Sequence, residues 1–192
     1  MRMLQSNINV LVACEESQRV CKAFLERGFN AFSCDIIEPS GDRPDRHILD
    51  DVLPLLNGNC EFSTMDGKRH KINGKWNLII AHPPCTYLSV AGAARLYVKK
   101  GVIDKERYKK GMEAKEFFMA FINADCEHIA VENPVQLRVF GIKRATQYIQ
   151  PYEYGHPYSK KTGLWLKGLP LLRPTEIITD EIISWVSGGV KH

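Results

Sequence analysis

The sequence predicts an α/β protein built around a mostly parallel β-sheet. Short apolar runs rich in β-branched residues alternate with helical patterns, and this alternation is typical of parallel strands joined by helices. Polar residues follow directly after several of these runs, at positions 15–17, 35, 50–51, 82–89 and 132–133. Because ligands of such sheets bind beyond the carboxyl ends of the strands, these positions are the expected site.

The first elements form a strand, helix, strand unit. "INVLVA" (8–13) is a short apolar run and predicts a buried strand. Apolar residues at helical spacing within 14–28, closed by a glycine, predict a helix. "NAFSCDI" (30–36) predicts a second strand, parallel to the first and reached by a right-handed crossover.

A turn-rich link and an insertion come next. The link leads to a short strand or helix start near Asp51. "CEFSTMDGKRHKI" carries Asp66-Gly67 between two extended stretches and predicts a hairpin, an insertion at about 58–75 that decorates the edge of the main sheet. "KWNLIIA" (75–81) predicts the next core strand.

The second half of the chain continues the alternation. The segment 104–124 predicts an amphipathic helix, and 126–134 predicts a buried strand that runs into a polar turn. The segments 146–155 and 162–168 predict two last strands, antiparallel neighbours. The tail, 169–192, predicts one weak helix.

Length and composition limit the class of protein. A chain of 192 residues predicts a single domain, residues 1–192. With 44% hydrophobic and 25% charged residues, it has the composition of a globular protein. We find no apolar segment long enough for a signal peptide or a membrane span, so a cytoplasmic protein without a membrane partner is expected. The net charge of +4 fits an anionic partner.

The six cysteines, at 14, 21, 34, 60, 85 and 126, are scattered. Because none has the spacing of a zinc site, no metal is expected, and most are interpreted as reduced core residues. Cys85 differs, since it follows the stiff pair Pro83-Pro84 at the end of a strand. It is a candidate nucleophile, with a buried structural thiol as the plainer alternative.

Four acidic residues follow predicted strands. Asp35 is placed to bind ribose hydroxyls, and Asp51 an adenine amino group, although Asp50 competes for that role and each can instead cap a turn or helix. The first turn, "ACEESQR", lacks the glycines of a phosphate cradle, which an adenosine ligand without phosphates would not need. Glu132 is expected near Cys85, and a thiol and a carboxyl form a coherent catalytic pair.

These motifs together resemble the cytosine carbon-5 DNA methyltransferases. "HPPCTYLS" is similar to the family's Pro-Cys-Gln motif with its trailing serine, and "VENPVQL" to its Glu-Asn-Val motif. "VLVACEESQRV" falls at its cofactor loop, and "YGHPYSKKTGLWLKG" at its Gly-Val-Pro-Gln turn and basic strand. Order and rough spacing match from about Ile8 to Gly168, and the chain resembles most the short phage- or prophage-borne relatives.

The resemblance implies a fold and a reaction. The fold is the Rossmann-like class I of S-adenosylmethionine-dependent methyltransferases, with one antiparallel strand near the C-terminus. The Cys85 thiolate adds to carbon 6 of a cytosine, Glu132 holds ring nitrogen 3 and the exocyclic amine, and carbon 5 receives the methyl group. The implied acceptor is DNA, with the target base out of the duplex, or a cytosine nucleotide.

The resemblance also implies the binding residues. Those for the cofactor S-adenosylmethionine are Ala13, Glu16, Ser17, Asp35, Ile36, Asp51 and Pro83. Those for the substrate are Pro84, Ser89, Asn133, Lys160 and Lys161.

The sequence departs from the family at several points. Residues 14–17 replace the glycines of the cofactor loop, Thr86 replaces a glutamine, and Tyr158 replaces another. The family's target-recognition domain does not fit after Lys167. We therefore expect the insertion, a second copy of the chain or a helper subunit to replace it.

Other functions stay open. The same chemistry can act on RNA or a free nucleotide. "HPPC" also resembles the Asp-Pro-Pro-Tyr turn of amino-group methyltransferases, which need no thiol. A degenerate fold that only binds nucleic acid or a nucleotide is a third interpretation. A thiol enzyme with His82 as base is weaker, because no third orienting residue is evident.

Overall fold

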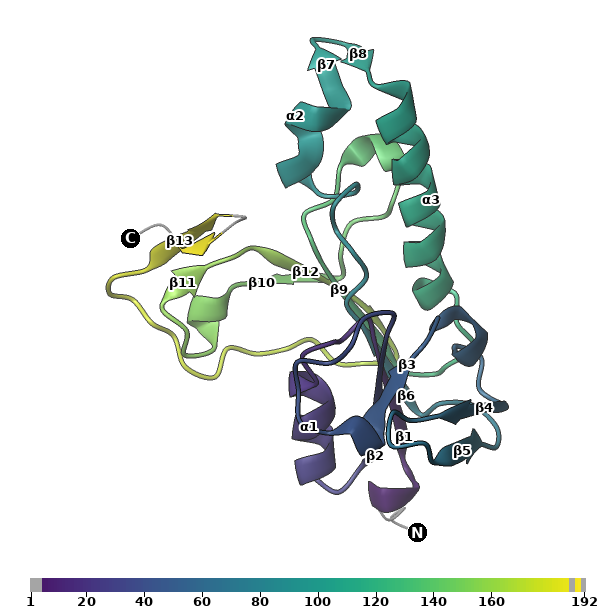
Figure 1. Cartoon of the computed structure of the whole chain (residues 1–192). Coiled ribbons are helices and arrows are strands. Elements are labelled where there is room, and N and C mark those ends of the chain that lie inside the picture. The colour runs from purple at the N-terminus through teal and green to yellow at the C-terminus, as the bar shows by residue number, and fades with distance from the viewer. Residues whose placement is uncertain (1–4, 187–188, 191–192) are drawn as a thin grey trace. The chain divides into compact units, whose positions relative to one another are not determined.

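The computed structural model of the chain describes residues 5–186 and 189–190. It is an α/β protein with a mixed seven-stranded sheet, in the order β10-β12-β9-β6-β1-β2-β3 (Figure 1). Most of its strands are parallel, and β10 and β12 run antiparallel to each other. The α/β fold and the mostly parallel sheet are therefore as the sequence predicts.

The main sheet and its helices are built from few elements. They are β1 (Asn9–Ala13), α1 (Arg19–Glu26), β2 (Asn30–Asp35), β3 (His47–Leu49), β6 (Leu78–Ala81), α2 (Ala93–Leu96), α3 (Lys105–Ile122), β9 (Ile129–Pro134), β10 (Gln147–Ile149) and β12 (Thr162–Lys167). The smaller sheets are formed by β4 (Cys60–Ser63), β5 (Arg69–Ile72), β7 (Tyr97–Lys99), β8 (Val102–Ile103), β11 (Tyr158–Ser159), β13 (Ile183–Val186) and β14 (Gly189–Val190). Short 3-10 turns include η3 (Leu53–Leu55), η5 (Arg138–Phe140) and η6 (Pro151–Glu153).

The chain divides into two compact units, which are described separately. The first contains residues up to Pro83, with Phe118–Val131 and Lys167–Leu169. The second contains Pro84–Phe117, Glu132–Leu166 and the residues from Pro170 onward.

Buried strands form the core of the first unit. Residues 10–13 of β1 are completely buried, because β1 lies between two parallel neighbours, β2 and β6. Helix α1 contacts β1 and β2 (Figure 1), and Val20, Phe24 and Leu25 pack against the buried strand residues. Burial on both sides explains the continuous apolar runs of the sequence.

The predicted hairpin is confirmed. Strands β4 and β5 pair antiparallel from Cys60↔Ile72 to Ser63↔Arg69, and Gly67 supplies the left-handed backbone at the turn, with φ 83°. They form a two-stranded sheet of their own. Phe62 of β4 packs edge-on against Phe32 of β2, with ring centroids 5.0 Å apart.

The second unit holds α2, the β7–β8 hairpin and most of α3 (Figure 1). Asp104 caps α3, because its Oδ1 accepts a hydrogen bond from Arg107 N at 2.7 Å. Gly111 lets the helix approach η5 closely, since a Cβ there would lie 2.2 Å from Phe140 Cζ. The antiparallel pairing of β10 with β12, Gln147↔Leu164 to Ile149↔Thr162, confirms the predicted pair of last strands.

The third strand ends at Leu49, and Asp50 and Asp51 follow it directly, as expected. One expectation needs correction. The tail was expected to hold a weak helix, but its described residues form β13, which pairs with β11. Strand pairing with a distant segment has overridden the weak local preference of the tail.

Among the described residues, no helix combines the length and apolar composition needed to cross a membrane.

Candidate active site

The turn after β1 is held in shape by a buried carboxylate. Cys14 and Gln18 both have φ 56°, in the left-handed region that glycine favours. Between them Glu15, only 4% exposed, folds back onto α1. Its carboxylate accepts hydrogen bonds from Val20 N and, at 3.1 Å, from Cys21 N. Burial raises the pKa of Glu15, and these two hydrogen bonds lower it in part.

This contact has a consequence for ligand binding. The first turn of a helix offers free N–H groups to anions, and many nucleotide sites place a phosphate there. In this chain the carboxylate of Glu15 already takes donors of α1. These two donors of α1 are therefore already used within the chain.

A buried polar network lies behind the turn, and no pattern in the sequence indicates it. Gln18 is completely buried. Its Nε2 donates to Ser33 Oγ at 3.1 Å and to Arg43 O at 2.9 Å, and its Oε1 accepts from Arg43 N at 3.0 Å. Ser33 Oγ also lies 2.9 Å from Nδ1 of His47, whose pKa is lowered by burial.

The predicted adenosine acids lie near the end of β1. Together with burial, the charges of Asp35 and Asp51 raise the pKa of the Cys14 thiol to about 12. Each acid also uses one oxygen locally: Asp35 Oδ1 accepts from Ile37 N at 3.3 Å, and Asp51 Oδ1 from Leu53 N at 3.0 Å. Asp50 Oδ1 accepts from Asp51 N at 2.7 Å. The turn and cap contacts weighed from the sequence are thus present, together with a shared electrostatic environment.

Other predicted cofactor residues line a cavity of about 290 Å³ in the first unit. Glu16 and Ser17 lie there with Cys14, Arg19 and His82. Glu16 Oε2 accepts from Ser40 N at 3.2 Å, and hydrogen bonding to Ser40 lowers its pKa.

The remaining cofactor residues do not line this cavity. Ala13 and Pro83 are buried, at the end of β1 and beyond β6. Asp35 and Asp51 lie outside the cavity lining, and Ile36 is 77% exposed after β2.

In the second unit, Cys85 lies in a tight turn. It is half-buried, and its carbonyl oxygen accepts hydrogen bonds from Leu88 N at 3.2 Å and Ser89 N at 3.0 Å. Pro84 is exposed, while Ser89 is buried. The turn holds the backbone of the cysteine firmly while leaving the side chain partly accessible.

The Cys85 turn is joined to the segment that follows Glu132. Ser89 and Gln136 form an antiparallel bridge, Val90 N donates to Val135 O at 2.8 Å, and Leu137 N donates to Leu88 O at 2.7 Å. We call this set of backbone contacts, between 88–90 and 135–137, the 89/136 clip. It connects the two motifs that the sequence assigned to catalysis.

The strands that lead to the Cys85 turn and carry Glu132 are neighbours in the sheet. Strands β6 and β9 are adjacent and parallel, with Ala81 opposite Val131. Glu132 comes directly after Val131 and lies within β9, and Cys85 is the fourth residue beyond the end of β6. The sequence predicted that neighbouring strands precede these motifs, and this placement is confirmed.

The amide of Asn133 has a partner that the sequence did not reveal. Asn133 is 1% exposed, and its Oδ1 accepts a hydrogen bond from Gln136 Nε2 at 2.6 Å. Glu132 is half-buried. A glutamine three residues after the motif was the only available clue to this contact.

The predicted basic residues lie at the start of β12. Lys160 and Lys161 are both exposed. Lys161 Nζ lies 4.8 Å from the centre of the Tyr148 ring, within the range of a cation–π contact. Thr162 Oγ1 donates to Lys160 O at 3.0 Å.

The described residues contain no group of three or more His, Cys, Asp and Glu side chains that could hold a metal ion. In comparisons with known proteins, no family model and no curated protein matches the chain. The chemistry must therefore be argued from the residues of each unit. The second unit holds a half-buried thiol whose turn is joined to the segment after Glu132, and the first holds a turn after β1 in which a carboxylate occupies donors of α1.

Proposed function

We propose that this protein is an S-adenosylmethionine-dependent methyltransferase that acts on carbon 5 of cytosine through a covalent adduct with Cys85. The observation that carries the proposal is the 89/136 clip. It joins the turn of a half-buried cysteine to the segment after Glu132, and the strands before both motifs are neighbours in register. A thiol and a carboxyl that belong to neighbouring strand ends would suit addition to a ring carbon with support at a ring nitrogen.

The fold supports the same proposal. From β1 the chain builds outward through β2 to β3, then returns to place β6 on the other side of β1. Such a reversal creates a topological switch point, where ligands of open parallel sheets bind. A Rossmann-like class I methyltransferase, the fold that the resemblance implies, is consistent with this order.

The residues near the turn after β1 fit the cofactor. Asp35 and Asp51 would hold the adenosine, with Ile36 against its base, while Glu16 and Ser17 line the adjoining cavity. S-adenosylmethionine supplies the methyl group and needs no phosphate-binding turn, in agreement with the position of Glu15.

The residues of the chain would act in the following order. The Cys85 thiolate forms a bond to carbon 6 as the carbon 5–carbon 6 double bond opens toward carbon 5, while Glu132 holds ring nitrogen 3 and the amine. After carbon 5 has gained the methyl group, it gives its proton to a water molecule, the double bond re-forms, and the Cys85–carbon 6 bond breaks to release the thiolate. Asn133 and Ser89, both buried, would hold the pocket backbone in place.

A methyl-transfer assay with a cytosine-containing oligodeoxynucleotide tests this reaction. We expect Cys85→Ser to lower the rate by at least about a thousandfold, since the covalent step is lost. Cys60→Ser, a change of the same kind in the β4–β5 hairpin, should keep the activity. An oligonucleotide with 5-fluorocytosine should form a stable adduct at Cys85, because carbon 5 then has no proton to lose.

The same assay separates the alternatives. Full activity of Cys85→Ala without an adduct would replace the proposal with an amino-group methyltransferase. A calorimetric titration with S-adenosylmethionine, compared with Asp35→Ala, tests the cofactor half. A folded protein that binds no S-adenosylmethionine would leave a binding protein, and both enzyme proposals would be abandoned.

A further inference from the structure

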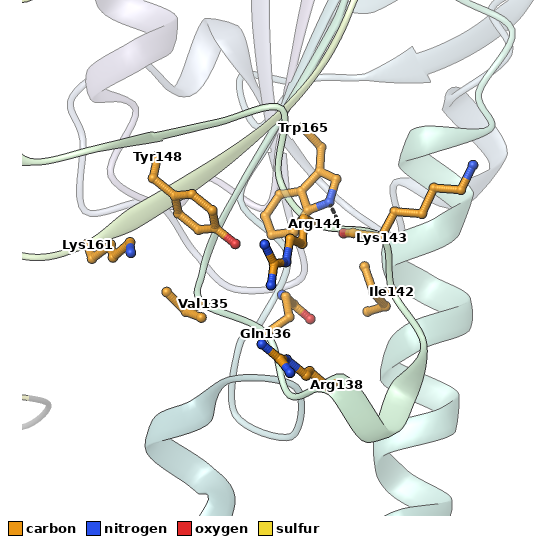
Figure 2. A pocket seen from close by; sticks show the side chains of 9 residues that line it. All are labelled: Val135, Gln136, Arg138, Ile142, Lys143, Arg144, Tyr148, Lys161 and Trp165. Atoms are coloured by element: carbon orange, nitrogen blue, oxygen red, sulfur yellow. Dashed lines mark hydrogen bonds between the residues drawn. The ribbon is translucent and has the colours of Figure 1, made fainter.

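The second unit contains a pocket of about 310 Å³ whose lining includes neither Cys85 nor Glu132 (Figure 2). Its volume lies at the lower end of the range for small-molecule sites. The lining comes from the segment after β9, the segment that leads to β10, and the strands β10 and β12. These residues are Val135, Gln136, Arg138, Ile142, Lys143, Arg144, Tyr148, Lys161 and Trp165.

The pocket carries uncompensated positive charge. No aspartate or glutamate occurs among its lining residues, all of which the structure describes. Arg138, Arg144 and Lys161 form no ion pair with any described carboxylate. Figure 2 shows the guanidinium of Arg144 pointing into the pocket and that of Arg138 at its lower edge. Cations that converge without a carboxylate partner favour an anionic ligand.

The fourth cationic residue has another role. Figure 2 shows the side chain of Lys143 pointing away from the pocket. Its carbonyl oxygen accepts a hydrogen bond from Trp165 Nε1 at 2.8 Å and so fixes the indole ring. The charge that lines the pocket is therefore that of two arginines and a lysine, all with exposed side chains.

The walls are apolar and aromatic. Trp165 is 7% exposed, and Val135 and Ile142 are half-buried. Gly163 makes room for the indole, because a Cβ at that position would lie 3.0 Å from Trp165 Cζ3. The ring of Tyr148 stands beside it, with its hydroxyl turned inward (Figure 2). A ligand of this pocket should carry a flat apolar part as well as a negative charge.

Gln136 supplies a polar group at the inner wall. Its Oε1 is buried and has no hydrogen-bond partner among the described residues. A buried acceptor without a partner carries a free-energy cost that a ligand N–H can remove. The Nε2 of the same side chain donates to Asn133, so the pocket adjoins the Glu-Asn motif through one residue.

We propose that this pocket binds a nucleoside phosphate, with the phosphate on Arg144 and Arg138 and the nucleoside against Trp165 and Tyr148. Guanidinium groups pair well with phosphate oxygens, and aromatic rings stack on bases. The nucleoside phosphate is either a free nucleotide or one unit of a nucleic acid strand. That its base is cytosine rests on the proposed function, whereas the phosphate and ring contacts do not.

Equilibrium binding to the full chain, without S-adenosylmethionine, tests the pocket. Cytidine 5′-monophosphate and cytidine are titrated by calorimetry, and a fluorescein-labelled oligo(dC) strand by anisotropy. The nucleotide should bind at least about tenfold more tightly than the nucleoside, as expected for a charge-assisted contact. Arg144→Ala and Arg138→Ala should each weaken binding by about tenfold or more.

Arg173→Ala is the matched control, because Arg173 is exposed in the same unit and lies outside the pocket. Equal binding of nucleotide and nucleoside, or equal losses in Arg144→Ala and Arg173→Ala, would overturn the proposal. Similar affinity for nucleotide and strand supports a free nucleotide. Much tighter binding of the strand than of the nucleotide supports a nucleic acid, provided that Arg144→Ala reduces the salt dependence of strand binding.

The assay is also independent of catalysis. A protein that binds the nucleotide through Arg144 but transfers no methyl group would contradict only the proposed function. A protein that methylates cytosine while Arg144→Ala binds normally would contradict only the pocket.

Discussion

At the scale of single residues, Cys14 and Cys85 are similarly exposed to solvent but lie in different surroundings. They are the two half-buried cysteines among the six, all of which the structure describes. The pKa of Cys14 is raised to about 12 by burial and by the charges of Asp35 and Asp51. The thiolate, not the thiol, is the nucleophile in alkylation, so Cys14 should react poorly.

Alkylation of the native protein should therefore begin at Cys85. At pH 8, a thiol with a pKa of about 12 is ionised to a fraction on the order of 10⁻⁴. Iodoacetamide treatment followed by peptide mass spectrometry would identify the modified residue. The double variant Asp35→Asn, Asp51→Asn should accelerate labelling of Cys14. An unchanged labelling rate of Cys14 in the double variant would show that the two carboxylates do not protect this thiol.

At the scale of elements, the approach of α3 to η5 depends on one glycine. Phe140 is 1% exposed, and its ring stacks on Tyr108 of α3 with centroids 5.7 Å apart. One turn along the helix, Gly111 leaves the space that the ring fills. A residue that is unfavourable within a helix is here required by packing.

Gly111→Ala should destabilise the protein, against the usual preference of helices. Alanine is favoured over glycine by about 1 kcal/mol in a helix interior. Here the added Cβ would lie 2.2 Å from Phe140 Cζ, and overpacking of this kind costs about 1–3 kcal/mol. Urea denaturation measures the free energy of unfolding. In a Phe140→Leu background the same change should cost less or stabilise, and an equal cost in both backgrounds would refute the steric explanation.

At the scale of the whole molecule, buried titratable groups couple stability to pH. Burial lowers the pKa of His47 below its usual 6.5, so the folded state takes up a proton less readily than the unfolded state. Its contribution is complete above about pH 6.5 and is lost as the pH falls toward its folded pKa. Glu15 acts in the opposite direction, because its raised pKa favours the folded state most below 4.5.

The free energy of unfolding should therefore contain a term from His47 that decreases between pH 7 and pH 5. Urea denaturation of the protein and of His47→Asn across this range isolates the term, since Glu15 and the other groups are common to both. We expect the difference between the two proteins to shrink as the pH falls. A constant difference would mean that His47 has the same pKa in the folded and unfolded states.

Prediction from sequence succeeded where burial acts on contiguous residues. Strand β1 appears as an apolar run because both of its faces are covered. Cys85 comes after β6, and Glu132 lies near the end of the neighbouring strand β9. Contacts between distant residues were out of reach. The bond from Gln18 to Arg43 spans 25 residues, and the pairing of Tyr158 with Ile183 turned the expected tail helix into a strand.

The position of Glu15 also bears on the choice of chemical probes for this chain. Compounds that carry a diphosphate to engage the start of a helix would compete there with a carboxylate that is tethered in place. Because Glu15 is part of the chain, its local concentration at the helix start does not fall on dilution. Compounds screened against the turn after β1 should therefore be mainly neutral or cationic. The same choice should disfavour binding to proteins that hold a phosphate at the start of a helix.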